Sequence, residues 1–93
     1  MKDTVTLRKI GKSLGFTIDP HIILDLSIKE KDIVHIQINE IIKEKEIIQV
    51  SLHYSRNTIK IGESSLGITL KKNITDRFGL EMGILLGIDV TTK

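Results

Sequence analysis

The sequence contains no cysteine and no tryptophan, and its only aromatic side chains are Phe16, Tyr54 and Phe78. Without cysteine the chain can form no disulfide, no thiolate metal site and no cysteine nucleophile, which fits a reducing compartment, and we expect the cytoplasm. With so few aromatic residues, a core must be built mainly from isoleucine, leucine and valine. That composition favours strands over helices.

Long apolar runs are also missing. No run approaches the roughly 18 residues that a membrane span requires, and the chain leads from Met1 directly into a strand-like segment rather than into a signal peptide. We therefore expect no membrane partner. The length of 93 residues allows one modest core, which predicts a single domain over residues 1–93.

Excess charge of either sign is small, because the formal net charge is only +2, but the charge is unevenly distributed. Residues 1–17 and residues 47–72 each carry a net charge of +3, whereas all other stretches are negative. Two basic blocks in a nearly neutral chain favour a nucleic-acid partner, with chance clustering as the alternative explanation.

A repeat runs through the chain. The segment Lys9–Ile18 (KIGKSLGFTI) recurs as Lys60–Leu70 (KIGESSLGITL) with one inserted residue, so that Lys-Ile-Gly repeats at an offset of 51 and Ser-Leu-Gly at an offset of 52. The apolar pattern then continues in register without a gap, pairing Ile22 with Ile74, Leu26 with Phe78, Ile28 with Leu80 and Ile36 with Ile88. We interpret the domain as two copies of one unit, residues 4–54 with an added hairpin and residues 57–93.

Within each copy the pattern predicts strand, glycine-bearing loop, strand, short helix and strand. The expected strands are 4–10, 14–18, 32–42 and 46–54 in the first copy, and 57–61, 66–70 and 84–91 in the second. Asp19 and Pro20 predict a capped helix over 20–26. Asn73 and Asp76 resemble a capping box for a helix over 74–78, which Gly79 ends. Phe16 and Phe78 are expected in the core.

A unit of this size with one short helix buries too little surface to fold alone, so the two copies must share a core. The chain would then be a pseudo-dimer whose two basic strand-loop-strand elements are related by approximate two-fold symmetry. Duplex DNA has a matching pseudo-dyad.

Three segments together resemble the AbrB/MazE/SpoVT swapped-hairpin family of DNA-binding domains: Val5–Ile18 (VTLRKIGKSLGFTI), the expected helix 20–26, and Leu26–Val34. The resemblance covers nearly the whole chain, twice. It implies a mainly β fold with two short helices, forming a swapped-hairpin barrel. In the family two chains normally interleave to build this barrel, whereas here one chain would do so as an intramolecular pseudo-dimer.

The resemblance also implies that basic residues of the first strand and its loop reach the major groove of double-stranded DNA. The positions carried over are Arg8, Lys9, Lys12 and Ser13 in the first copy and Lys60, Ser64 and Ser65 in the second. The second copy departs from the family pattern, since it lacks the proline and carries Glu63 in its loop. Weaker binding by that copy is expected unless Lys71 and Lys72 compensate.

These residue types suit the role, because arginine can bond bidentately to guanine and either cation can neutralise phosphate. A plainer interpretation remains open: lysine on a strand edge also discourages sheet aggregation, and serine in a tight loop is often turn chemistry. His21, His35 and His53 show no metal-ligand spacing. The glycines fit no nucleotide fingerprint. We expect no metal, no cofactor and no enzyme.

The sequence therefore predicts a transcriptional regulator that binds double-stranded DNA. Alternatives are an antitoxin that also autoregulates its operon, an architectural chromatin protein, and a purely structural dimerisation module. A toxin partner is disfavoured because the chain shows no acidic tail after its last expected strand. Further dimerisation of the pseudo-dimer, through the added hairpin, is also compatible with the sequence.

Overall fold

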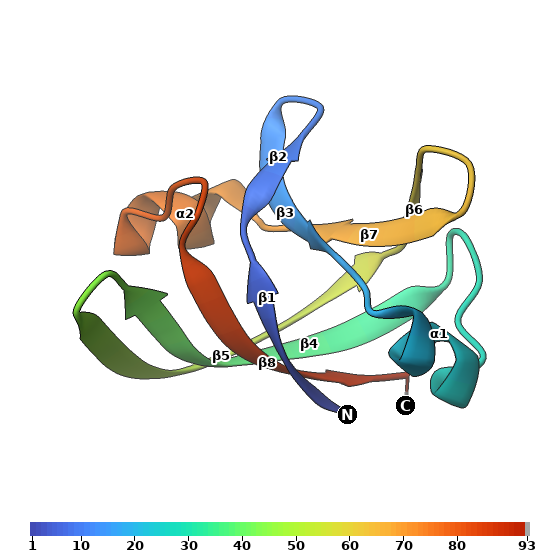
Figure 1. Cartoon of the computed structure of the whole chain (residues 1–93), viewed down its shortest axis with the longest axis horizontal. Helices are drawn as coiled ribbons and strands as arrows, with labels where there is room; N and C mark the ends of the chain where they lie inside the picture. The colour runs from blue at the N-terminus through green and yellow to red at the C-terminus, as the bar shows by residue number, and fades with distance from the viewer. Residues whose placement is uncertain (93) are drawn as a thin grey trace.

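The protein is mainly β, with short helices at two points of the chain. The computed structural model describes residues 1–92, and Figure 1 shows their arrangement. The strands are β1 (Lys2–Thr6), β2 (Arg8–Ile10), β3 (Ser13–Thr17), β4 (Ile33–Lys43), β5 (Glu46–Asn57), β6 (Ile59–Ile61), β7 (Ser65–Thr69) and β8 (Leu85–Thr91), and the helices are α1 (Pro20–Leu26) and α2 (Lys72–Phe78). Within residues 1–92, no helix is long and apolar enough to cross a membrane.

The strands form two antiparallel sheets with the core between them. One sheet has the order β1-β8-β4-β5 and the other the order β2-β3-β7-β6, which lies above the first in Figure 1. Branched aliphatic side chains fill the space between the sheets, as the composition predicts. Phe16 of β3 and Ile68 of β7 are both fully buried and lie opposite each other in the register.

The strand register repeats at the offsets seen in the sequence. Around Phe16 and Ile68, Gly15 pairs with Thr69 and Thr17 pairs with Gly67, so β3 and β7 are related by an approximate two-fold axis. The same relation holds where the chain crosses between sheets: the Leu7 amide donates to the Ile84 carbonyl at 2.8 Å, and the Thr58 amide donates to the Asp32 carbonyl at 2.8 Å. These repeated contacts support the interpretation of two copies around one core.

The first expected strand is broken, contrary to the prediction of one strand over 4–10. Leu7 is buried and separates β1, in one sheet, from β2, in the other. Thr58 does the same between β5 and β6, so β5 runs on to Asn57 instead of ending near Tyr54. In both cases the residue that bridges the sheets is buried and bonded to the opposite half, which no local sequence pattern reveals.

The two helices differ in how they begin. Helix α1 has the predicted bounds, and Asp19 Oδ1 accepts a hydrogen bond from the His21 amide at 2.7 Å. Helix α2 begins at Lys72. The side chain of its N-cap residue, Lys71, makes no capping hydrogen bond. The capping-box prediction for Asn73 and Asp76 is therefore wrong. The Leu70 amide is bound to the Leu14 carbonyl as the Ile18 amide is bound to the Leu66 carbonyl, so α2 begins at Lys72, the position equivalent to Pro20, and Asn73 lies inside the helix.

The predicted end of α2 at Gly79 and the predicted burial of Phe16 are confirmed, whereas Phe78 is less buried than expected. Gly79 adopts a left-handed conformation with φ of 58° at the end of α2, as expected. Phe16 is fully buried, whereas Phe78 is only partly buried at the edge of the core, with the Arg77 guanidinium 5.3 Å from the centre of its ring.

Candidate nucleic-acid interface

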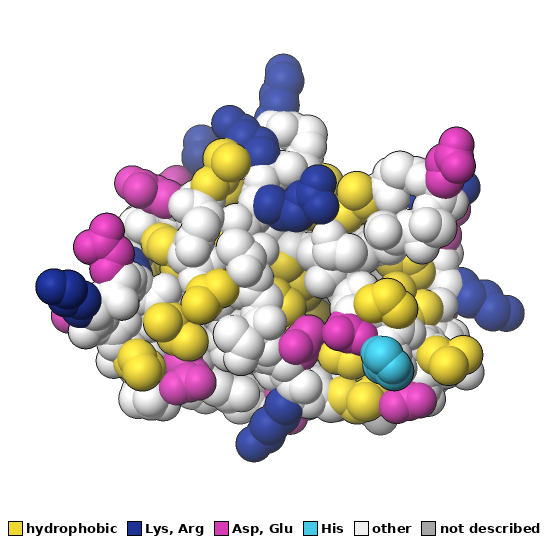
Figure 2. Space-filling model, viewed as in Figure 1, with side chains coloured by type: hydrophobic (Ala, Val, Ile, Leu, Met, Phe, Trp, Pro, Cys, Tyr) yellow, Lys and Arg dark blue, Asp and Glu magenta, His cyan; other side chains and the backbone are white. Residues whose placement is uncertain are grey.

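The β2–β3 hairpin projects from the body of the molecule (Figure 1). It is tightly closed, since Ile10 pairs with Ser13 across the turn formed by Gly11 and Lys12. Lys9 and Lys12 are exposed and Ser13 is half-buried. Figure 2 shows basic side chains gathered over this hairpin, at the top of the view.

Arg8 and Lys9, which were expected to act together, lie on opposite faces of β2. Lys9 pairs with Leu14, whereas Arg8 pairs with Gly15, and side chains alternate between faces along a strand. The Arg8 guanidinium donates to the Thr17 hydroxyl at 3.3 Å. The structure therefore separates Arg8 from the other predicted site residues of this hairpin.

On the Lys9 side, the hairpin and α2 enclose a groove of about 510 Å³. Apolar side chains form part of its lining, including Leu14 and Leu70. Its charged lining residues are Lys9 and Lys12 from the hairpin, Arg56 from β5, Lys72 and Asp76 from α2. Four cations and a single carboxylate thus converge on one concave surface, which we call the basic groove.

Arg56 belongs to the basic groove but was not among the predicted site residues. Its Nε donates to the Thr69 hydroxyl at 3.1 Å, which fixes the guanidinium beside β7. The signal was present in the sequence, because Arg56 lies in the second basic block and is two residues beyond buried Tyr54 on the same face of a strand. It was missed because β5 was expected to end at Tyr54.

The β6–β7 hairpin presents fewer cations. Lys60 and Ser64 are exposed, Ser65 is half-buried, and Glu63 stands in the turn. Ile59 pairs with Gly67 in the way that Arg8 pairs with Gly15, so this hairpin has no arginine at that position. The predicted residues Lys60, Ser64 and Ser65 therefore lie apart from the basic groove.

The two consecutive lysines at the start of α2 have different positions. Lys72 lines the basic groove. Lys71 is exposed at the helix N-cap and is not among the groove residues. Of the two, only Lys72 adds its charge to that of the first hairpin.

Within the described residues 1–92, the cations of the basic groove have no ionic partners. Among residues 1–92, the Met1 amino group forms an ion pair with Asp89 at 2.7 Å, and the only other contact of this kind is between the His21 ring and the Asp19 carboxylate at 3.2 Å. The groove cations are therefore available to an anionic ligand without first breaking a salt bridge. Exposed cations of this kind attract phosphate and release its condensed counterions.

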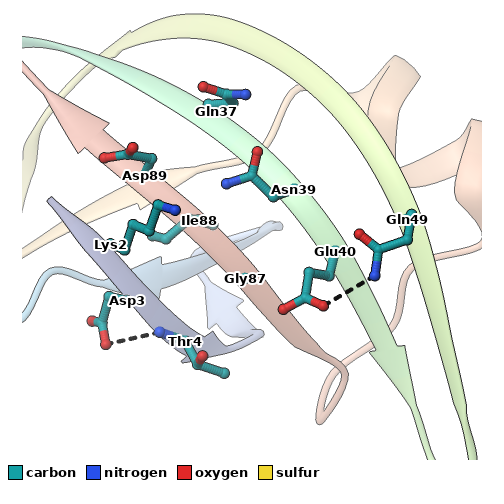
Figure 3. Close-up of a pocket in the computed structure, with 10 residues that line it drawn as sticks. All are labelled: Lys2, Asp3, Thr4, Gln37, Asn39, Glu40, Gln49, Gly87, Ile88 and Asp89. Atoms are coloured by element: carbon teal, nitrogen blue, oxygen red, sulfur yellow. Dashed lines mark hydrogen bonds between the residues drawn. The ribbon is translucent and has the colours of Figure 1, made fainter.

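A larger hollow, of about 800 Å³, lies on the outer face of the first sheet (Figure 3). Its charged lining residues carry both signs, and they include Lys2, Asp3, Glu40 and Asp89. Some of its polar groups bond to one another: Gln49 donates to Glu40 at 3.3 Å, and the Thr4 amide donates to the Asp3 carboxylate at 2.8 Å. Across the part of the chain that the structure describes, no group of three histidine or carboxylate side chains could hold a metal ion. This surface offers no concentrated charge comparable with the basic groove.

Comparison with protein-family models, with curated protein sequences and with solved structures finds no match.

Proposed function

We propose that the protein is a transcriptional regulator that binds double-stranded DNA through its projecting β hairpins, with the basic groove as the main contact surface. The observation that carries this proposal is the convergence of Lys9, Lys12, Arg56 and Lys72 around one groove between a projecting hairpin and α2. A two-stranded ribbon of this kind fits the major groove of DNA.

The strand pairing is compatible with the swapped-hairpin fold that the sequence resembles. Strand β1 pairs with β8 of the other half, and β4 pairs with the part of β5 that leads into β6. Each half thus completes its sheet with a strand from the other. This exchange of strands supports the proposal that the single chain is an intramolecular pseudo-dimer.

The dimensions suit contact with one face of a duplex. Both hairpins project toward the same side of the molecule (Figure 1), and the longest extent of the chain is 34 Å. One turn of B-DNA measures about 34 Å, so two contacts related by the pseudo-dyad fit within one turn. The β2–β3 hairpin would carry most of the affinity, with Arg8, Lys60, Ser64 and Ser65 as peripheral contacts.

The individual cations would have different roles. Lys12 stands at the tip of the hairpin and is the residue best placed to enter a groove. Lys9 and Lys72 flank the basic groove and would neutralise phosphates. Arg56 is held by the Thr69 hydroxyl, and a positioned guanidinium is suited to bidentate contact with phosphate or guanine.

The test is fluorescence anisotropy on duplex DNA from the upstream region of the protein's own gene and on a scrambled duplex, over a salt series. We expect a preference of roughly a thousandfold for the upstream duplex. In the Lys9→Ala/Lys12→Ala variant, the slope of log K against log salt should become shallower by about 1.8, that is, about 0.9 for each lost phosphate contact.

The matched control is Lys29→Ala/Lys45→Ala, which removes the same charge from two exposed lysines outside the basic groove. Its salt slope should equal that of the wild type. Equal binding to both duplexes would replace the regulator with an architectural protein that coats DNA. Absence of binding at low salt would refute every DNA-binding function for this chain.

A further inference from the structure

The two sheets end in four edge strands of very unequal length. Strand β5 has 12 residues, whereas β1 has five and β2 and β6 have three each. An edge strand exposes a row of unpaired backbone groups that can accept another strand. The β5 edge is by far the longest surface of this kind in the molecule.

The β5 edge lacks the residues that usually block strand addition, and its one irregularity is a one-residue shift in its pairing with β4, between Leu52 and Gln49. Between Glu46 and Ser55 the sequence has no proline, glycine, lysine or arginine, and burial alternates regularly along the strand. Within residues 1–92, the backbone of Glu46–Arg56 makes no hydrogen bond other than those that pair it with β4. By contrast, the β1 edge carries Lys2, and its Thr4 amide is already bonded to the Asp3 carboxylate at 2.8 Å.

The first part of β5 also lies outside the repeated core. The register that relates β4 to β8 and β5 to β1 uses Ile33–Ile38 and His53–Asn57. The residues between them, 39–52, form a hairpin arm that has no equivalent in the other half. The inner side of this arm packs against the core through Ile48 and Val50, but Ile47 on its outer side is 60% exposed. The edge of the arm is therefore not required to hold the two sheets together.

We propose that β5 pairs antiparallel with β5 of a second copy of this chain, centred on Val50, so that the β1-β8-β4-β5 sheets of two molecules join into one. In this register Val50 faces itself, Ile48 faces Leu52, and Gln49 faces Ser51. Ile48, Val50 and Leu52 already share the core side of β5, so the apolar row continues across the junction.

The choice of a second copy follows from this self-complementarity. Within two residues of Val50, apolar residues meet apolar residues and uncharged polar residues meet each other, and beyond them Ile47 falls opposite His53. The single charge of the strand before Arg56 is Glu46, which falls opposite Tyr54 and not opposite its own copy. Like charges, which destabilise cross-strand pairing, never meet in this register. The proposal concerns association between chains and does not depend on DNA binding.

The experiment is sedimentation equilibrium of the full chain without DNA, from low micromolar to millimolar concentration. We expect the wild type to reach twice the mass of one chain. The Gln49→Lys/Ser51→Lys variant places lysine opposite lysine twice in the dimer, at two exposed positions. Its dissociation constant should rise by at least about tenfold, while its circular dichroism spectrum remains that of the wild type.

The control variant is Gln49→Lys/Ser51→Glu, which places lysine opposite glutamate twice in the proposed register only. In both variants the lysine introduced in place of Gln49 would also face Glu40 of β4, so the contacts of that lysine within one chain are matched. Retained dimerisation in this variant and its loss in the double lysine variant would establish both the edge and the register. A monomeric wild type, a double lysine variant that stays dimeric, or a monomeric control would each overturn the proposal, whatever the DNA experiment shows.

Discussion

The two hairpins have nearly the same backbone but different charges. The charged positions of the basic groove are Lys9, Lys12, Arg56, Lys72 and Asp76, and the positions that correspond to them in the other half are Lys60, Glu63, Val5, Pro20 and Leu24. Four cations and one carboxylate are thus matched by one cation and one carboxylate. The two-fold symmetry of the strand pairing does not extend to the charge of the surface.

This difference indicates that the two halves share the requirements of the core and not those of the surface. Buried positions such as Phe16 and Ile68, or Ile36 and Ile88, remain apolar in both halves because all of them belong to one shared core. Exposed positions are free of that constraint. A chain with two hairpins can then keep one for strong ligand contact and vary the other.

The largest effect is expected where the halves meet. Phe16→Ala should lower the free energy of unfolding by about 3–5 kcal/mol and Ile68→Ala by about 2–5 kcal/mol, because each leaves a cavity at the pseudo-dyad. Since both residues belong to one core, each variant should unfold in a single cooperative transition in urea. Two separate transitions in either variant would show that the halves fold independently and do not share one core.

A smaller effect is expected at Tyr54, which occupies in β5 the place that Asp3 occupies in β1. Its hydroxyl is buried, and among the described residues it has no hydrogen-bond partner. Tyr54→Phe should therefore raise the free energy of unfolding by about 1–2 kcal/mol at neutral pH.

The same residue predicts a pH dependence. Burial raises the pKa of Tyr54 well above its ordinary value of 10.0, and the nearby Arg56 opposes this only in part. Above pH 10 the unfolded chain loses the phenolic proton while the folded chain keeps it, so the stability of the wild type should fall as the pH rises. The gap in stability between Tyr54→Phe and the wild type should widen from pH 9 to pH 11 in urea titrations. A constant gap would contradict a raised pKa.

The helix ends allow a finer test of equivalence. Ser27 after α1 and Gly79 after α2 both adopt a left-handed conformation, with φ of 53° and 58°. A side chain is strained there, so Gly79→Ala should cost about 1–2 kcal/mol, whereas Ser27→Gly should gain about 0.5–1 kcal/mol. Thermal unfolding of both variants measures this. Changes of the same sign would mean that the two helix ends are not equivalent.

Much of the fold could be predicted from the sequence, because its signals are local. The Asp19-Pro20 pair defined α1, and alternation with turn residues located most of the strands. The break at Leu7 and the extension of β5 could not be predicted, since both depend on hydrogen bonds to the opposite half of the chain. The start of α2 was misplaced for the same reason.

The candidate site was predicted less completely. The lysines of the first hairpin and Lys72 do converge, but Arg8 lies on the other face of β2, and Arg56 arrives from a distant strand. Residue spacing within one hairpin indicates which side chains share a face only when the pairing partner is known. The grouping of Arg56 with Lys9 depends on how β5 passes under β7, which is a tertiary property.

The smallest effect is expected from the charge of the second hairpin. Glu63 in the second hairpin corresponds to Lys12 in the first, and it is exposed in the turn. If both hairpins approach the same duplex, Glu63→Lys should add about one phosphate contact, steepening the salt slope by about 0.9 and tightening binding a few-fold. Glu44→Lys, an equal charge change at the tip of the β4–β5 hairpin, should leave the slope unchanged. Equal slopes for Glu63→Lys and the wild type would mean that DNA meets only the basic groove, so the second hairpin would serve the fold alone.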